Sequence, residues 1–168
     1  MVIMVTDQPL QDAKMAYSDD DLKVKAQATA DAFAKAYNKK HKSKIPVPVG
    51  MTFELEYTKP RTAGIAVGFE RIELNMTLMR DYPVDFLNWV IPHEVAHLAQ
   101  TFLSLEGGDH GPAWRRLMES MYRKTHAKHN FDTRKAVAVY EAHKTAMKAA
   151  TKAMRKARSP LNGTLAFE

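Results

Sequence analysis

Apolar residues recur at helical spacing in the first third of the chain, which predicts an amphipathic helix over residues 18–38. Ser18 precedes a run of three Asp, and these acids suit the first turn of a helix that Ser18 caps. The apolar stripe consists of Leu22, Ala26, Ala30, Phe33 and Tyr37. Residues 1–17 show no such period, so they are predicted to form an N-terminal arm.

Between residues 51 and 75, apolar and polar residues alternate instead, which predicts three strands over 51–57, 62–67 and 70–75. Gly64 lies inside the second of these and indicates a close backbone approach or a bulge. Strands at this short spacing favour a small antiparallel meander.

Helical spacing returns around residues 86–102, where Asp81 is placed to cap the helix and Pro83 suits its first turn. Pro92 removes one helix hydrogen bond and is expected to kink this helix just before residue 93. Further helices are predicted over residues 112–124 and 133–156. The expected class is therefore α+β, mainly helical, with a small three-stranded antiparallel sheet.

A length of 168 residues indicates one main domain, which we place at residues 18–130, followed by a basic helix and tail at 131–168. Residues 1–110 carry 12 Lys and Arg against 15 Asp and Glu, whereas residues 111–168 carry 13 against 4. A basic segment of this kind indicates contact with a polyanion such as DNA, although a solvated Lys-rich helix has the same composition. Its stripe from Tyr140 to Met154 suits packing on the domain, pairing with a partner or alignment along a phosphate backbone.

The chain contains no cysteine, so neither disulfides nor thiolate metal sites are expected, which is typical of a reducing compartment. Its N-terminus lacks the basic head and apolar run of a signal peptide, and no segment offers about 20 uncharged apolar residues. We therefore expect a cytoplasmic protein with no membrane partner.

The chemistry of the chain centres on the pentapeptide His93-Glu94-Val95-Ala96-His97. Two His four positions apart on a helix lie about 40° apart around the axis and about 6 Å along it. Both imidazoles can therefore bind one Zn²⁺, while Glu94 lies beside them, close enough to reach a water molecule on the metal. This geometry is typical of a zinc hydrolase, usually a peptidase.

A catalytic zinc needs a third protein ligand, and His110 is the first candidate. It lies 13 positions after His97 on a short turn between Gly-containing segments, which excludes the compact metzincin spacing. Glu106 and Asp109 are alternative third ligands on the same turn. The remaining histidines, His126, His129 and His143, are interpreted as surface residues rather than a second metal site.

Several motifs together resemble the SprT-like family, which includes bacterial SprT and the eukaryotic DNA-dependent protease Spartan. The matching segments are Ala63-Gly64, Ile72-Glu73-Leu74-Asn75, Val90-Ile91-Pro92-His93-Glu94-Val95-Ala96-His97 and His110-Gly111-Pro112-Ala113-Trp114. The resemblance implies a zincin-like metalloprotease domain in which His93, His97 and His110 bind zinc and Glu94 is the catalytic base. In the Spartan branch it also implies cleavage of proteins crosslinked to DNA.

The chain departs from many SprT-like proteins because it has no cysteine and so lacks their C-terminal zinc ribbon. The basic helix is a candidate replacement in DNA contact. A donor for the developing oxyanion is not identified by the pattern, and Tyr122, His126 and Arg80 are candidates only. The alternative to a protease is a zinc-stabilised DNA-binding or adaptor module without turnover. The oligomeric state does not follow from the sequence.

Overall fold

The computed structural model describes residues 17–42, 44–45, 50–121 and 128–158. The elements follow in the order α1 (Asp19–His41), β1 (Gly50–Thr52), η1 (Leu55–Tyr57), β2 (Gly64–Val67), β3 (Arg71–Leu74), α2 (Met76–Asp81), α3 (Pro83–Asp85), η2 (Phe86–Val90), α4 (Ile91–Phe102), α5 (Pro112–Ser120) and α6 (Arg134–Arg158). Helices dominate and the sheet is small, which confirms the α+β class. The predicted arm, apart from Tyr17, lies outside the described residues.

Helix α1 forms where the sequence predicts it and ends three residues later. Ser18 and Asp21 make a reciprocal capping box, with the Asp21 N–H donating to Ser18 Oγ at 3.1 Å and the Ser18 N–H donating to Asp21 Oδ2 at 3.2 Å. The five predicted stripe residues are all buried, and α1 lies against α4. The capped start and the buried stripe together explain why this segment is a helix.

The sheet is three-stranded, but the predicted antiparallel meander is only partly right. Strand β3 lies in the centre, pairing antiparallel with β2 and parallel with β1. The first predicted strand stops at Thr52 because the chain turns into η1, where the carboxylate of Glu56 is buried. This carboxylate accepts hydrogen bonds from the Met76 N–H at 3.1 Å and from Thr77 Oγ1 at 3.3 Å. The turn carries the chain past β3, so that β2 pairs on the opposite edge.

The segment leading to α4 is helical from Pro83 onward, but a π turn, η2, lies between α3 and α4 just ahead of Pro92. The N–H of Ile91 donates to the carbonyl of Phe86, five residues back. A proline has no N–H and its ring clashes with the carbonyl four residues earlier, so a wider turn before Pro92 accommodates it. Pro83 occupies the first turn of α3 as predicted, but Asp81 ends α2 and bonds Lys135 Nζ at 2.6 Å instead of capping this segment.

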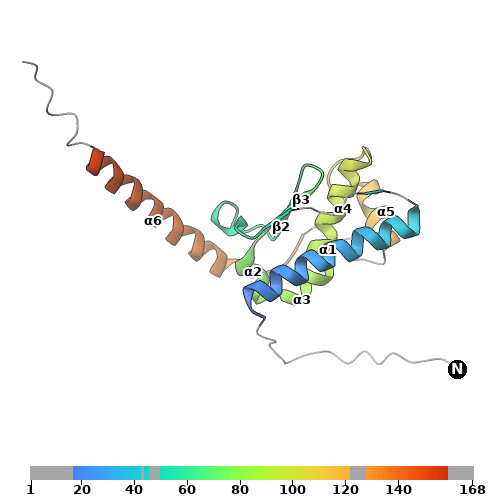
Figure 1. Cartoon of the computed structure of the whole chain (residues 1–168), viewed down its shortest axis with the longest axis horizontal. Helices are drawn as coiled ribbons and strands as arrows, with labels where there is room; N and C mark the ends of the chain where they lie inside the picture. The colour runs from blue at the N-terminus through green and yellow to red at the C-terminus, as the bar shows by residue number, and fades with distance from the viewer. Residues whose placement is uncertain (1–16, 43, 46–49, 122–127, 159–168) are drawn as a thin grey trace, which may run out of the picture.

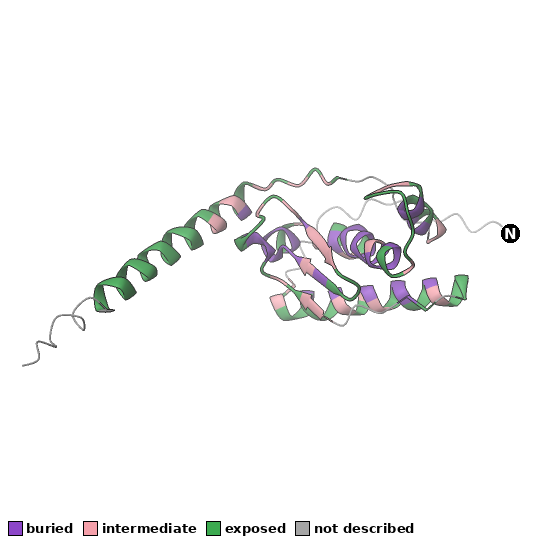
Figure 2. Ribbon diagram, turned by 90° about the horizontal axis from the view of Figure 1, so that it is seen from above, coloured by how far each residue is buried: buried purple, intermediate pink, exposed green. Residues whose placement is uncertain are grey.

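The core lies where α1 and the sheet meet α4, and Figure 1 shows α4 between these elements. Helix α6 projects away from this body, and Figure 2 shows its outer part exposed on all sides. Its first turns are anchored, since Ala136 is fully buried. Met147 and Met154 are 55% and 67% exposed, so the stripe packs on the domain only near Tyr140. None of the helices in the described residues is long and apolar enough to span a membrane.

Candidate metal centre

Helix α4 places His93 and His97 on one face, one turn apart. Their Nε2 atoms lie 3.2 Å from each other, with His93 buried at 6% exposure and His97 half-buried. Residues four apart share a helix face, so the apolar side of α4 that packs in the core also fixes the direction of both rings. The two imidazoles are therefore held in place by the packing of the helix.

The loop between α4 and α5 brings His110 to the same point. Its Nε2 lies 2.9 Å from that of His93 and 3.1 Å from that of His97. His110 has a positive φ of 57°, and Gly107 and Gly108 before it also have positive φ. A Cβ on Gly111 would lie 1.9 Å from the carbonyl oxygen of Gly107, so this tight turn requires glycine there.

The side chain of Gln100 fastens this loop to α4. Its Nε2 donates to the carbonyl of Gly108 at 3.1 Å and to that of Leu105 at 3.4 Å. Gln100 is buried at 8% exposure, three positions after His97. Sequence reasoning did not single it out, although a polar residue on the apolar side of a helix was a usable signal.

The three ring nitrogens fit a single metal ion. All three Nε2 atoms converge on one point, and their separations of 2.9–3.2 Å approach the edge of about 3.3 Å expected for tetrahedral ligands at about 2.0–2.1 Å from an ion. A neutral imidazole has one N–H, so three nitrogens that face one another cannot all be satisfied by hydrogen bonds. A cation among them resolves this conflict.

The environment favours the neutral, ligating form of His97 and His110. Burial lowers the pKa of His97 to about 4, and the neighbouring His110 adds to the effect while Asp109 opposes it. The pKa of His110 is also lowered, again mainly by burial. Metal binding requires deprotonated imidazole, so these two rings are ready to bind at neutral pH.

Trp114 forms the floor beneath the three rings. It is fully buried, and its ring centroid lies 4.6 Å from that of His93 and 4.8 Å from that of His110. Its Nε1 donates to the carbonyl of His93 at 3.4 Å. Trp114 is therefore a core residue that supports the site from below.

Glu94 points from α4 toward β2, and its carboxylate is buried at 6% exposure. Burial raises the pKa of Glu94 to about 8, while a hydrogen bond from the backbone N–H of Ala66 opposes the shift and the charge of Asp109 adds to it. A Cβ on Gly64 would lie 2.9 Å from Glu94 Cγ. This confirms the predicted close approach at Gly64, and shows that the approaching group is the carboxylate side chain of the motif.

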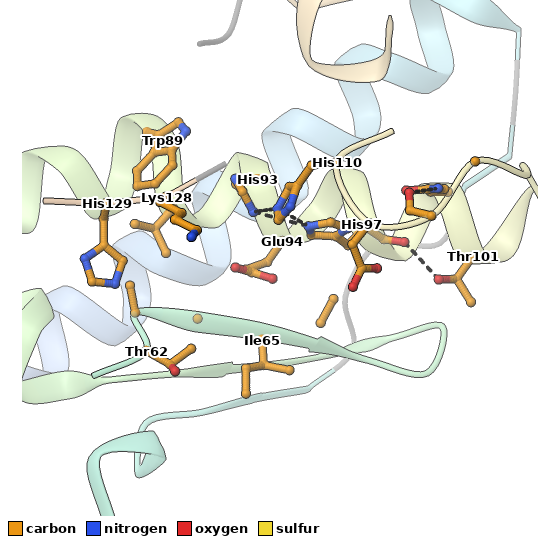
Figure 3. A pocket seen from close by; sticks show the side chains of 18 of the residues that line it. Thr62, Ile65, Trp89, His93, Glu94, His97, Thr101, His110, Lys128 and His129 are labelled. Carbon is orange, nitrogen blue, oxygen red and sulfur yellow. Dashed lines mark hydrogen bonds between the residues drawn. The ribbon is translucent and has the colours of Figure 1, made fainter. Parts of the chain in front are cut away.

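The triad and Glu94 line a cleft of about 740 Å³, which is in the usual range for ligand sites. Figure 3 shows the cleft running between α4 and the edge strand β2. The Asn75 N–H donates to the Ala63 carbonyl, and this bond fixes how the backbone groups of β2 alternate. The N–H and carbonyl of Ile65 point toward β3, whereas those of Gly64 and Ala66 point toward the cleft. The edge strand β2 therefore runs beside the three imidazoles, with the Ala66 N–H bonded to Glu94 and the other outward groups of Gly64 and Ala66 directed into the cleft.

The other candidate residues take different places. Glu106 and Asp109 line the cleft, but they are exposed and do not belong to the group that could hold the ion. Arg80 forms an ion pair with Asp19 at 2.5 Å and does not line the cleft. Tyr122 and His126 lie outside the described residues.

His129 differs from the sequence interpretation, because it is half-buried and lines the cleft instead of lying on the open surface. Its neighbour Lys128 and the more distant Arg61 also line the cleft, and sequence reasoning missed both because neither belongs to a motif. His143 is exposed on α6 as expected. Within the described residues there is no second group of three side chains able to hold a metal ion.

Comparison with known proteins gives one family. A family model described as SprT-like matches residues 30–136. Protein SprT of Vibrio parahaemolyticus is 31% identical over 136 residues, covering 71% of this chain and 80% of that protein. Protein SprT of Actinobacillus succinogenes is 30% identical over 89 residues, covering 49% of this chain and 52% of that protein. Among solved structures, none matches the chain significantly.

Proposed function

Because the chain belongs to the SprT-like family, we propose that it is a zinc-dependent endopeptidase. The observation that carries this proposal is the convergence of three imidazole nitrogens beside the buried carboxylate of Glu94, in a cleft bordered by the edge strand β2. A site that only stabilised the fold would need no carboxylate of this kind beside the ion.

The donor set supports zinc as the metal. His93, His97 and His110 offer three nitrogen ligands, which is the number that catalytic zinc sites take from the protein. When bound there, Zn²⁺ would polarise the scissile carbonyl and lower the pKa of a water molecule toward about 7.

Glu94 would act as the general base. Its carboxylate would take a proton from the attacking water and pass it to the leaving amine. Burial raises the pKa of Glu94 in the metal-free site, and a cation bound beside the carboxylate would favour its ionised, proton-accepting form. The N–H of Ala66 and the narrow space above Gly64 hold the carboxylate in place for these transfers.

The free edge of β2 would bind the substrate as an added strand. The outward N–H and carbonyl of Gly64 and the outward carbonyl of Ala66 can pair with an extended polypeptide, while the Ala66 N–H stays bonded to Glu94. This pairing places the carbonyls of the polypeptide near the three imidazoles. Backbone pairing recognises an extended chain whatever its side chains, as an endopeptidase requires.

The test is the pair Glu94→Gln and parent, both loaded with zinc. We expect the variant to keep about one zinc per chain by elemental analysis and to lose hydrolysis of a denatured protein. The control variant is Lys35→Gln, on the exposed face of α1. A change closer to the site, such as Gln100→Glu, would not serve because it disturbs the loop that carries His110. Equal rates for parent and Glu94→Gln would reject the protease and favour the alternative, a zinc-stabilised adaptor.

The basic helix α6 supports a second proposal, that the protein contacts DNA and acts on proteins bound or crosslinked to it. Residues 134–158 carry eight Lys and Arg against the single acid Glu141, and most of this helix is exposed. Replacing Lys144, Lys148 and Lys152 with Gln should weaken binding to duplex DNA and reduce its salt dependence. Binding that is absent at low salt, or unchanged in the triple variant, would reject this proposal.

A further inference from the structure

The two ends of the cleft carry opposite charge. At one end lie Arg61 and Lys128, and at the other lie Glu106 and Asp109, and all four side chains line the cleft. Each is exposed, so each can meet a side chain of a bound polypeptide. The three imidazoles and Glu94 lie between the two pairs.

Contacts within the protein show where the basic and acidic ends of the cleft lie along α4. The basic end lies near Trp89, because His129, next to Lys128, stacks on Phe131 at 4.5 Å and Phe131 lies 6.4 Å from Trp89. Figure 3 shows Lys128 and His129 on the Trp89 side, with Thr101 on the opposite side of the triad.

The acidic end lies beyond His97. There the side chain of Gln100 bonds the carbonyls of Leu105 and Gly108, which places the segment carrying Glu106 and Asp109 at the far end of α4. From the basic end to the acidic end, the cleft therefore follows α4 from its beginning to its end.

Strand β2 gives this charge difference a direction. The chain enters at the basic end, where the backbone of Arg61 bonds His129, and runs toward Gly64 and Ala66 beside Glu94. A substrate strand that pairs antiparallel with β2, the more stable arrangement, runs the opposite way. Its N-terminal part then lies at the acidic end and its C-terminal part at the basic end.

We propose that the cleft selects extended polypeptides with Lys or Arg before the cleaved bond and Asp or Glu after it, read by Glu106 and Asp109 on one side and by Arg61 and Lys128 on the other. This inference rests on the proposed peptidase function. Each charged pair lies about one helix turn beyond the nearest His of α4, a distance of about 5 to 6 Å. A bound strand advances about 3.3 Å per residue over that distance. The charged positions are therefore about two or three residues from the cleaved bond.

The experiment uses three internally quenched peptides and the zinc-loaded full chain. The neutral peptide has no charged residues. The forward peptide has Lys at the second and third positions before the central bond and Glu at the second and third positions after it. In the reversed peptide the Lys and Glu residues change places. We expect kcat/KM for the forward peptide to exceed that for the reversed peptide about tenfold at low ionic strength, and the ratio to fall as salt screens the exposed charges. Mass spectrometry identifies the bond that is cleaved.

Charge-reversal variants assign the effect to named side chains. Lys128→Glu and Glu106→Lys should each reduce the forward-to-reversed ratio about three- to tenfold. Lys35→Glu on α1 and Glu119→Lys on α5 make the same changes in net charge on exposed residues that do not line the cleft, and they should leave the ratio unchanged. A ratio that shifts equally in the control variants would overturn the proposal, because net charge would then explain it.

The outcomes separate this inference from the peptidase proposal. Hydrolysis of the neutral peptide with equal rates for the charged peptides, or with the reversed peptide preferred, rejects the charge selection and keeps the peptidase. Failure to cleave any peptide rejects the peptidase. In that case the binding of fluorescent forward and reversed peptides to zinc-loaded Glu94→Gln still decides the charge direction, and tighter binding of the reversed peptide would overturn it.

Discussion

Helices α4 and α6 both carry an apolar stripe at helical spacing, but they meet different surroundings. In α4 the buried set includes the polar residues His93, Glu94 and Gln100, enclosed by α1, α5 and the sheet. In α6 even Met147 and Met154 are mostly exposed. The spacing of apolar residues therefore tells which side of a helix is apolar, but not whether another element covers that side.

The cost of burial explains what the two helices can do. Buried polar groups are unfavourable unless they are bonded or bind an ion, so those of α4 must have defined partners and positions. The Lys and Arg side chains in the outer part of α6 are exposed to water, so they are available to a polyanion. Chemistry that requires fixed geometry is expected in the first region and screened, adaptable contact in the second.

The largest expected difference between the regions concerns the metal. His110→Ala removes one of three ligands and should reduce zinc affinity by more than about a hundredfold, with loss of hydrolysis. His143→Ala on α6 removes a histidine from the other region and should leave zinc affinity unchanged. Zinc titration of both variants makes this comparison, and equal affinity for the two would contradict the assignment of the site.

The two helical regions should also differ in how much they contribute to the free energy of unfolding. Trp114→Ala removes a fully buried ring beneath the imidazoles and should lower the free energy of unfolding by about 3–5 kcal/mol. Met154→Ala on α6 should change it by less than about 0.5 kcal/mol, because that side chain is mostly in water. Denaturant unfolding of the metal-free proteins measures both, and a large loss in Met154→Ala would show that α6 is covered in solution.

The geometry of Glu94 can be tested without touching the motif. Gly64→Ala places a Cβ 2.9 Å from Glu94 Cγ, so the carboxylate must shift, and we expect kcat to fall about tenfold to a hundredfold with zinc content unchanged. Gly50→Ala in β1 is the matched control, since its Cβ would meet only Arg71 Cγ at 3.9 Å. If both variants retain full turnover, Gly64 does not position the base.

The smallest effect is expected at the start of α6. The bonds from Arg134 lower the pKa of Asp132 to about 2. A carboxyl group whose pKa is lowered by folding stabilises the fold above its unfolded value of about 4, and this contribution is lost as the pH falls through about 2. In Asp132→Asn the free energy of unfolding should therefore fall slightly less between pH 4 and pH 2 than in the parent.

Much of the site could be predicted from the sequence because its chemistry is local. The spacing of His93 and His97 alone places two rings on one helix face, and the glycines around His110 indicate the turn that the structure shows. The position of Gly64 against Glu94 could be predicted only as a close approach, because the partner belongs to an element 30 positions away. Distant pairs of this kind leave no periodic signal.

The order and direction of the strands could not be predicted for a similar reason. Alternation over residues 51–57 looked like a strand, but the buried Glu56 bonds Met76 and Thr77, and that tertiary contact turns the chain. The cleft residues Arg61 and Lys128 were missed because only the folded chain brings them to the same cavity. Single-residue patterns describe an element, whereas these features depend on which elements meet.

The π turn η2 also sets how sensitive the site is to changes in chain length. This turn holds one residue more than an α-helical turn, just ahead of Pro92. Since an α-helix rotates by about 100° per residue, loss of a single residue between Phe86 and Val90 would swing both imidazoles of α4 away from His110. A deletion variant of this kind would retain the whole pentapeptide and yet have no common point at which its three rings could bind an ion.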